Sequence, residues 1–318
     1  MSAATVIGES LVDRIVGADG AVREVAGGSP MNVAVGLARL GVDTTLYTRF
    51  GTDRLGQMIG CHLAESGVRV APGSVSGAAT SSATANIDEE GAAHYLFDIR
   101  WDPELGGLGA ADVLHTGSIG ALLEPGADRV LEALEAAETS TLVSFDPNIR
   151  PAVLGNHSTV VERVERLAAQ ADVVKMSDED AGWLYPEVGH AQIADAYVER
   201  GVSLFVITRG PRPCLVRTSA HSFAVTPRAV SVVDTIGAGD AFMSGLLFAC
   251  LEDDHVGAVV GRRLTLDAVQ SIIGTALESS AITVGRLGAS PPDRRALAEA
   301  AGGGLLRVPR RARVAPRP

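Results

Sequence analysis

Lysine is almost absent from this chain of 318 residues, which contains one lysine, Lys175, and 26 arginines. A phosphate-binding P-loop needs a lysine inside the pattern G-x-x-x-x-G-K-S/T, and no such glycine frame surrounds Lys175. The lysine that protein kinases carry on their third strand is missing for the same reason. Every mechanism that depends on a lysine is therefore excluded except at that one position.

Cysteines and long apolar runs are also scarce. The three cysteines (Cys61, Cys214 and Cys250) lie far apart and form no C-x-x-C pair, which excludes a disulfide framework and a cysteine-rich zinc module. No run approaches the roughly 18 uncharged apolar residues of a membrane span. The first residues lack the basic region and apolar stretch of a signal peptide. We therefore expect a soluble cytoplasmic protein without a membrane partner.

Charge is unevenly distributed along the chain, whose net charge is −11. Residues 293–318 carry seven arginines and two acidic residues, whereas the preceding residues hold 20 basic and 36 acidic side chains. An acidic body repels a phosphate backbone, so nucleic acid is not an expected partner. We expect one domain over residues 1–292, followed by an Arg-rich segment, 293–318, that is partly disordered and solvated rather than a dedicated anion-binding arm.

Short β-rich runs alternate with helical stretches along most of the chain. The runs are residues 5–7, 44–48, 113–115, 141–145, 172–176 and 204–208, and the helical stretches include 127–138, 159–170 and 192–200. Strand, helix, strand at this spacing predicts an α/β fold with a mostly parallel central sheet and helices on both faces.

Two segments break this alternation and read as β-hairpins. Residues 11–26 have Ala18-Asp19-Gly20 as a turn, and residues 82–101 have Glu89-Glu90-Gly91. They predict a small β-sheet set on the edge of the main domain. The alternative is that they are edge strands of the same sheet.

The strongest chemical signal is V-D-T-I-G-A-G-D-A-F at residues 233–242, followed by an apolar stretch at 243–251. Gly-Ala-Gly at the start of a buried helix exposes unpaired N–H groups at the positive end of the helix dipole, which suits an anion. Asp240, in the first turn, could accept a proton from a hydroxyl during phosphoryl transfer, or it could merely cap the helix. Only the first two glycines of a G-x-G-x-x-G fingerprint are present, far from the first strand, which disfavours a dinucleotide enzyme.

A second signal lies at residues 26–41. Ser29 fits an N-cap, Pro30 the first helical position and Gly41 the stop of an almost wholly apolar helix. Asn32 is a polar amide in the first turn, beside two glycines that allow a ligand to approach the backbone. The alternative is an asparagine with a purely structural role.

The two signals together, GGSPMNVAVGLARLG (27–41) and DTIGAGDAFMSGLL (234–247), resemble the ribokinase (pfkB-type) carbohydrate kinases, and the resemblance runs from about Val6 to Pro292. The segments 8–13, 145–151 and 175–180 look most like those of bacterial fructokinases. The resemblance implies a ribokinase-like fold in which strands from about 11–26 and 82–101 form a small β-sheet lid. In this family the lid often also mediates dimerisation, so it implies a homodimer.

The resemblance also implies a role for each matching residue. Asp240 is the general base that takes the proton of the sugar hydroxyl, and the backbone of Gly237, Ala238 and Gly239 forms an anion hole. The implied sugar-binding positions are Asp13, Gly27, Gly28 and Asn32, joined by Phe97 and Arg100 of the second hairpin. The implied nucleotide-binding positions are Asn148, Ser177, Thr208, Gly210, Gly237 and Gly239.

The implied cofactors are ATP and Mg²⁺, with Asp180 as the metal-organising residue, and K⁺ is a further candidate near Asp234. The chain departs from the family at three places. Ser177-x-x-Asp180 replaces Asn-x-x-Glu, so that Ser177 could instead cap a helix; Pro211-Arg212-Pro213 replaces a further glycine; and Leu277 stands where a polar residue is common near adenine.

Substrate charge separates the remaining alternatives. Asp13 suits the hydroxyl groups of a neutral sugar as an acceptor, which favours a fructokinase or ribokinase, and the Asp146-Pro-Asn-x-Arg150 segment favours fructose. A 2-keto-3-deoxygluconate kinase would need an arginine near the lid, for which Arg100 is available, although Asp98 lies beside it. A regulator without catalysis would have lost the base or the anion hole, and both are intact.

Overall fold

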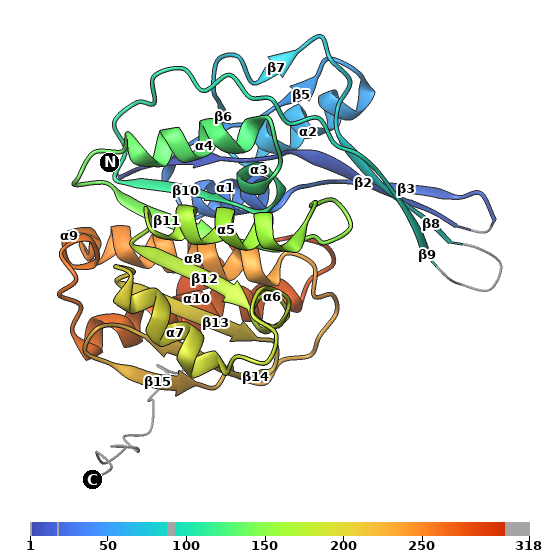
Figure 1. Ribbon diagram of the computed structural model, residues 1–318. Coiled ribbons are helices and arrows are strands. Elements are labelled where there is room, and N and C mark those ends of the chain that lie inside the picture. The colour runs from blue at the N-terminus through green and yellow to red at the C-terminus, as the bar shows by residue number, and fades with distance from the viewer. Residues whose placement is uncertain (1, 18, 88–92, 303–318) are drawn as a thin grey trace.

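Parallel strands buried on both faces form the centre of the protein (Figure 1). The structure is a computed structural model that describes residues 2–17, 19–87 and 93–302. The central sheet has nine strands in the order β15-β14-β13-β12-β11-β10-β1-β4-β6. The strands from β6 to β13 in this order are parallel, and β14 and β15 extend the sheet in antiparallel fashion. The strands are β1 (Ala3–Ile7), β4 (Asp43–Tyr47), β6 (Arg69–Val70), β10 (Val113–Gly117), β11 (Leu142–Asp146), β12 (Val173–Ser177), β13 (Leu204–Arg209), β14 (Arg212–Arg217) and β15 (Ser222–Val225).

Helices cover both faces of this sheet, and each face has its own apolar core. Neighbouring strand residues point to opposite faces, so that Val173 packs in one core and Val174 in the other. One core joins the sheet to α1 (Ser29–Arg39), α2 (Arg54–Glu65), α8 (Ala238–Glu252), α9 (Val256–Val260), α10 (Leu266–Val284) and α11 (Arg294–Gly302). The other joins it to α3 (Ser118–Leu122), α4 (Gly126–Glu135), α5 (His157–Ala168), α6 (Asp178–Leu184) and α7 (His190–Glu199).

The helices follow from their apolar spacing. In α4 the buried residues Ala127, Val130, Leu131 and Leu134 recur at the spacing of one helix face. In α8 every residue from Ala241 to Cys250 is buried, because this helix packs against α1 and α10 and shares their apolar core with the sheet.

A separate four-stranded sheet projects from the side of the main body (Figure 1). It consists of β2 (Leu11–Val16), β3 (Val22–Gly27), β8 (Ser82–Ile87) and β9 (Ala93–Asp98), in the order β3-β2-β8-β9, and we call it the lid sheet. Parallel pairing of β2 with β8 joins the two hairpins. The predicted small sheet is thereby confirmed, and its alternative, edge strands of the main sheet, is wrong. Ala18 and the Glu89-Glu90-Gly91 turn lie outside the described residues.

The remaining differences from the sequence prediction are small. All six predicted strands and all three predicted helices are present, with ends that differ by at most three residues. Strands β6, β14 and β15 of the main sheet were not predicted, and neither was the pairing of β5 (Phe50–Gly51) with β7 (Val75–Ser76). The Arg-rich segment begins with α11, whose Leu297 is buried against the core, and residues 303–318 lie outside the described part. No helix in the described ranges is long and apolar enough to cross a membrane.

Candidate active site

A cavity of about 1250 Å³ opens where the parallel strands end, between the lid sheet and the start of α8. Residues that follow the carboxyl ends of β1, β11, β12 and β13 line it, as is usual for ligand sites in open α/β sheets. Most residues predicted from the sequence line this one cavity: Asp13, Gly28, Asn32, Asn148, Ser177, Asp180, Thr208, Gly210, Gly237, Ala238, Gly239 and Asp240. Gly27, Phe97, Arg100 and Asp234 are not among the described residues that line it.

The start of α8 is built to leave backbone donors free. Gly237 is its N-cap in the left-handed conformation (φ 76°), and no side chain caps this helix among the described residues. The Ala238 N–H donates to the Thr235 carbonyl oxygen at 3.2 Å. The N–H groups of Gly239 and Asp240 therefore remain for an anion, at the positive end of the helix dipole.

The Asp240 carboxylate is held by another helix rather than by its own. Ser29 Oγ donates to Oδ1 at 2.7 Å, and Asn32 Nδ2 donates to Oδ2 at 2.8 Å. The interpretation of Asp240 as a mere helix cap is thus wrong. Each carboxylate oxygen keeps acceptor capacity, so the group can receive a proton from a bound hydroxyl.

The start of α1 differs from the sequence prediction. The helix begins at Ser29, and its N-cap is Gly28 (φ 116°) without a side-chain cap bond. Ser29 is not the cap, because its hydroxyl binds Asp240. A Cβ at position 28 would lie 2.5 Å from the Glu9 carbonyl oxygen, which explains the glycine. The predicted stop at Gly41 (φ 89°) is confirmed.

Only one of the two polar side-chain atoms of Asn32 has a hydrogen-bond partner among the described residues. Its amide nitrogen binds Asp240, whereas its Oδ1 is buried and has no hydrogen-bond partner among the described residues. A buried carbonyl oxygen without a donor is costly, and this one belongs to a cavity-lining residue. A ligand hydroxyl could supply the missing donor, so a purely structural role accounts for only part of the amide.

The lid side of the cavity carries two carboxylates and an arginine. Partial desolvation raises the pKa of Asp13, and the positive charge of Arg150 opposes this shift. Gly27 lies beside this aspartate, because a Cβ there would be 2.5 Å from Asp13 Oδ2. Glu9 accepts a hydrogen bond from the Gly120 N–H at 2.7 Å, and burial raises its pKa to about 7.

Asp180 serves as the partner in a capping box. Its Oδ2 accepts from the Ser177 N–H (2.8 Å) and hydroxyl (2.7 Å), and its Oδ1 accepts from the Ile149 N–H at 2.7 Å. The predicted alternative that Ser177 caps a helix is confirmed. Protein donors engage both oxygens, but Oδ1 accepts only the Ile149 N–H and keeps acceptor capacity for a further partner.

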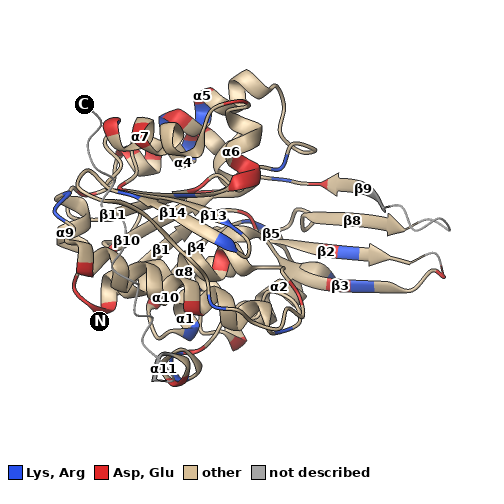
Figure 2. Cartoon of the chain, turned by 90° about the horizontal axis from the view of Figure 1, so that it is seen from below, with Lys and Arg blue, Asp and Glu red and all other residues tan. Residues whose placement is uncertain are grey.

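No group of three or more His, Cys, Asp or Glu side chains is arranged to hold a metal ion within the described ranges. Figure 2 shows the acidic first turn of α6, where Asp178, Glu179 and Asp180 follow one another.

Asp234 connects two loops, because its oxygens accept from the Ile236 N–H (3.0 Å) and the Gly288 N–H (2.9 Å). These backbone bonds lower the pKa of Asp234.

Three of the predicted nucleotide residues, Asn148, Thr208 and Gly210, line the cavity at the carboxyl ends of β11 and β13. Asn148 has a positive φ of 37°, and its Nδ2 donates to Ser118 Oγ at 3.5 Å. Thr208 Oγ1 donates to the Met176 carbonyl oxygen at 3.4 Å, and Gly210 (φ 56°) makes the turn between β13 and β14. Leu277 of α10 lines the same cavity.

The sequence reasoning missed a buried ion pair in this cavity. Lys175 Nζ lies 2.5 Å from Asp146 Oδ2, and both side chains are almost fully buried. Burial by itself would lower the pKa of Lys175, but the negative charges of Asp146, Asp240 and Asp180 raise it, so the ammonium stays charged. The signal was available, because the only lysine of the chain stands between apolar residues in a predicted strand.

Two predicted lid residues do not reach the cavity. Arg100 follows β9, is exposed, and its Nε lies 3.3 Å from Asp98 Oδ1. Phe97 of β9 is 37% exposed and is not among the residues that line the cavity. The arginine that lies near Asp13 in the cavity is Arg150 instead.

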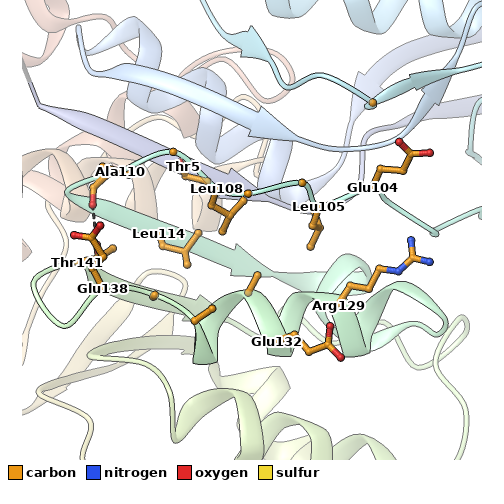
Figure 3. A pocket seen from close by; sticks show the side chains of 18 of the residues that line it. Thr5, Glu104, Leu105, Leu108, Ala110, Leu114, Arg129, Glu132, Glu138 and Thr141 are labelled. Carbon is orange, nitrogen blue, oxygen red and sulfur yellow. Dashed lines mark hydrogen bonds between the residues drawn. The ribbon is translucent and has the colours of Figure 1, made fainter.

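A second cavity of about 910 Å³ lies between α4 and residues 104–111 (Figure 3). None of the predicted site residues lines it. Its arginine, Arg129, already pairs with Asp102 at 2.7 Å and donates to the Pro103 carbonyl oxygen. The chemistry of the described residues is therefore concentrated in the first cavity.

Comparisons with known proteins agree with this geometry. The family model for the pfkB family carbohydrate kinases matches residues 1–294. A fructokinase of Rhizobium leguminosarum bv. trifolii is 31% identical over 263 residues, which cover 78% of this chain and 79% of that protein. The fructokinase of Xylella fastidiosa with bound ATP has a TM-score of 0.82 at 24% identity, covering 95% of this chain and 98% of that one. A fructokinase double mutant of Vibrio cholerae O395, in a fructose, ADP and potassium ion bound form, has a TM-score of 0.78 at 25% identity, covering 94% and 98%.

Proposed function

We propose that this chain, which belongs to the pfkB family of carbohydrate kinases, transfers the γ-phosphoryl group of ATP to a hydroxyl of fructose. One observation carries the proposal. The Asp240 carboxylate, held by Ser29 and Asn32, stands beside free backbone N–H groups in a single cavity. A base and an anion site next to each other are what phosphoryl transfer to an alcohol requires. The fructokinase relatives support fructose as the acceptor.

In the proposed reaction Asp240 accepts the proton of the sugar hydroxyl as its oxygen attacks the γ-phosphorus. The bond between this phosphorus and the bridging oxygen of ADP breaks, and ADP leaves with the bonding electrons. Negative charge builds on the transferring group, and the N–H groups of Gly239 and Asp240 stabilise it. The protein contributes mainly position and electrostatics, because phosphoryl transfer requires little covalent work from it.

The sugar would lie between α1 and the lid sheet. Asn32 Oδ1, which lacks a donor, and the Asp13 carboxylate both accept hydrogen bonds from hydroxyl groups. Gly27 and Gly28 keep this side of the cavity free of further side chains. Asp13 and Glu9 disfavour a substrate carboxylate, which supports a neutral sugar.

The donor in this proposal is ATP, bound near Asn148, Thr208 and Gly210 as its magnesium complex. Asp180 would help to organise the magnesium ion through Oδ1, which keeps acceptor capacity beside the Ile149 N–H. K⁺ would bind near Asp234, next to the loop that leads into α8. We further propose that the lid sheet pairs two copies of the chain, since Val22 and Leu96 expose apolar side chains on it.

A second candidate substrate is an acid sugar such as 2-keto-3-deoxygluconate. The observation in its favour is Arg150, which lines the cavity near Asp13 and could pair with a carboxylate. Asp13 and Glu9 oppose it, so we place it behind fructose, with ribose as the neutral alternative.

A sugar panel tests the proposal. Purified protein receives ATP, Mg²⁺ and fructose, ribose or 2-keto-3-deoxygluconate, and ADP release is followed by a coupled assay with a sugar-free control. We expect fructose to give the highest kcat/KM, and Asp13→Ala to raise the fructose KM and to lower kcat through lost positioning. A higher kcat/KM with the acid sugar would overturn the assignment to fructose, and no sugar-dependent ADP release would overturn the kinase proposal for these substrates.

A further inference from the structure

The ammonium group of Lys175 lies against the turn that starts α8. A Cβ added to Gly239 would be 3.0 Å from Lys175 Nζ, so glycine at this position makes room for the ammonium. Lys175, Gly239 and Asp240 line the same cavity. The only lysine of the chain therefore stands next to the backbone N–H groups that would receive the phosphoryl group.

The buried ion pair between Lys175 and Asp146 is not arranged in a way that would stabilise the fold. A buried ion pair stabilises a fold only when its geometry is excellent and further hydrogen bonds satisfy both partners. Asp146 Oδ1 has no hydrogen-bond partner among the described residues, and no contact other than Asp146 Oδ2 is seen for the ammonium there. An ammonium has three donors, so N–H groups are left over. They lie in a cavity, where an anionic ligand can reach them.

The negative charges around Lys175 also favour a cation at this point. Asp146, Asp180 and Asp240 all act electrostatically on Lys175, which places three carboxylates around one ammonium. Without Lys175 these carboxylates would face the incoming phosphates and repel them. Val173, two residues before Lys175 and on the same face of the sheet, is buried in an apolar core, so a hydrophobic residue would otherwise suit this position.

We infer that Lys175 is a further catalytic residue, which binds an oxygen of the transferring phosphoryl group together with the Gly239 and Asp240 N–H groups. Asp146 is a positioning residue, because its Oδ2 holds the ammonium at 2.5 Å and so leaves Asp240 free to accept a proton. Lys175 neither gains nor loses a proton in the reaction. This inference rests on the proposed kinase function.

The single lysine makes a direct test possible. Protein produced with isotope-labelled lysine and no lysine in its tag gives one lysine side-chain signal in an NMR spectrum. The signal is recorded for the free protein, with ADP, and with the non-hydrolysable imido analogue of ATP, which carries a third phosphate. We expect a clear shift with the imido analogue and a much smaller one with ADP. Equal shifts with both nucleotides, or none with either, would overturn the inference.

Variants provide an independent test with turnover as the readout. Lys175→Met alone leaves Asp146 buried and unpaired, which can unfold the protein, so the deciding variant combines Lys175→Met with Asp146→Asn. We expect this neutral pair to fold and to lose at least about 10²-fold in kcat, the cost of removing one transition-state donor, with little change in the sugar KM. A neutral pair that folds and turns over at nearly the wild-type rate would show a merely structural role and overturn the inference.

Asp172→Asn is the matched control, because Asp172 precedes β12 at its opposite end and binds the Val143 N–H at 2.9 Å, a contact that the amide oxygen keeps. It should turn over normally. If the neutral pair does not fold, the NMR comparison decides. Wild-type turnover distinguishes failure of this inference from failure of the proposed function. If the wild type is active but its lysine signal does not shift, only the role of Lys175 is refuted. If the wild type shows no sugar-dependent turnover, the proposed function itself is refuted.

Discussion

Replacing Asp240 with asparagine separates chemistry from structure at this site. The carboxylate accepts one hydrogen bond from Ser29 Oγ and one from Asn32 Nδ2. An amide at position 240 can accept from Asn32 through its oxygen and donate to Ser29, whose hydroxyl can turn to accept. Both hydrogen bonds can therefore survive the change, and what disappears is the basicity of the group.

The two expected magnitudes are far apart. Because the hydrogen bonds are conserved and α8 loses no cap, the free energy of unfolding should change by no more than about 1 kcal/mol. Loss of a general base typically costs about 10²–10⁴-fold in rate, so kcat should fall by at least about 10²-fold. Binding of ATP, which position 240 would contact only through its backbone N–H, should be little affected.

Sugar-dependent ADP release and thermal melting on the same preparation measure both quantities. The matched control is Asp253→Asn at the other end of α8, where Asp253 Oδ2 accepts a hydrogen bond from Ser271 Oγ at 3.2 Å. It makes the same chemical change outside the cavity and should leave kcat unaltered. A well-folded Asp240→Asn protein with nearly normal turnover would refute the assignment of Asp240 as the base.

Two further predictions concern stability. Burial raises the pKa of Glu9 from 4.5 to about 7, so wild-type stability falls as pH rises through this window, by up to about 3 kcal/mol. Glu9→Gln, which can still accept from Gly120, should match the wild type below pH 4.5 and exceed it above pH 7 in urea denaturation; a constant difference across this range would contradict the shift. Gly36→Ala should lose about 1–3 kcal/mol, because its Cβ would lie 2.3 Å from Ser244 Oγ. Gly274→Ala, with open space around it in α10, should gain up to about 1 kcal/mol, and equal midpoints for the two variants would contradict the packing.

The central fold could be predicted from local pattern because its strands are continuous apolar runs between periodic helices. β14 escaped prediction since Pro211-Arg212-Pro213 signals a turn. In the structure the pairing of β13 with β14 is irregular between Ile207 and Arg209, and Pro213 falls within this irregular stretch, where a missing N–H is tolerated. Such a register shift depends on the neighbouring strand and leaves no mark in the local sequence.

The site was predictable only in part, for a similar reason. Glycine-rich turns at helix starts are local signals, and they located Asp240 and Asn32. The bond between Ser29 and Asp240 joins residues 211 positions apart, and the contact between Lys175 and Asp146 joins neighbouring strands. Tertiary packing alone determines such pairs. Tertiary packing also explains why Ser29 is not an N-cap: its hydroxyl binds the Asp240 carboxylate instead of a backbone N–H group of its own helix.

The geometry of the base follows from how closely α1 and α8 approach one another. Gly36 of α1 has no side chain where it meets Ser244 of α8, and a Cβ there would lie 2.6 Å from Ser244 Cβ. Asn32 lies four residues before Gly36, and Asp240 lies four residues before Ser244. Each therefore lies on the face where α1 and α8 meet, one turn closer to the start of its helix. The absent side chain at Gly36 lets the helices come close enough for a short asparagine amide to reach the carboxylate at 2.8 Å. The orientation of Asp240 is therefore a property of the core beneath the cavity, and a glycine remote from any substrate helps to set it.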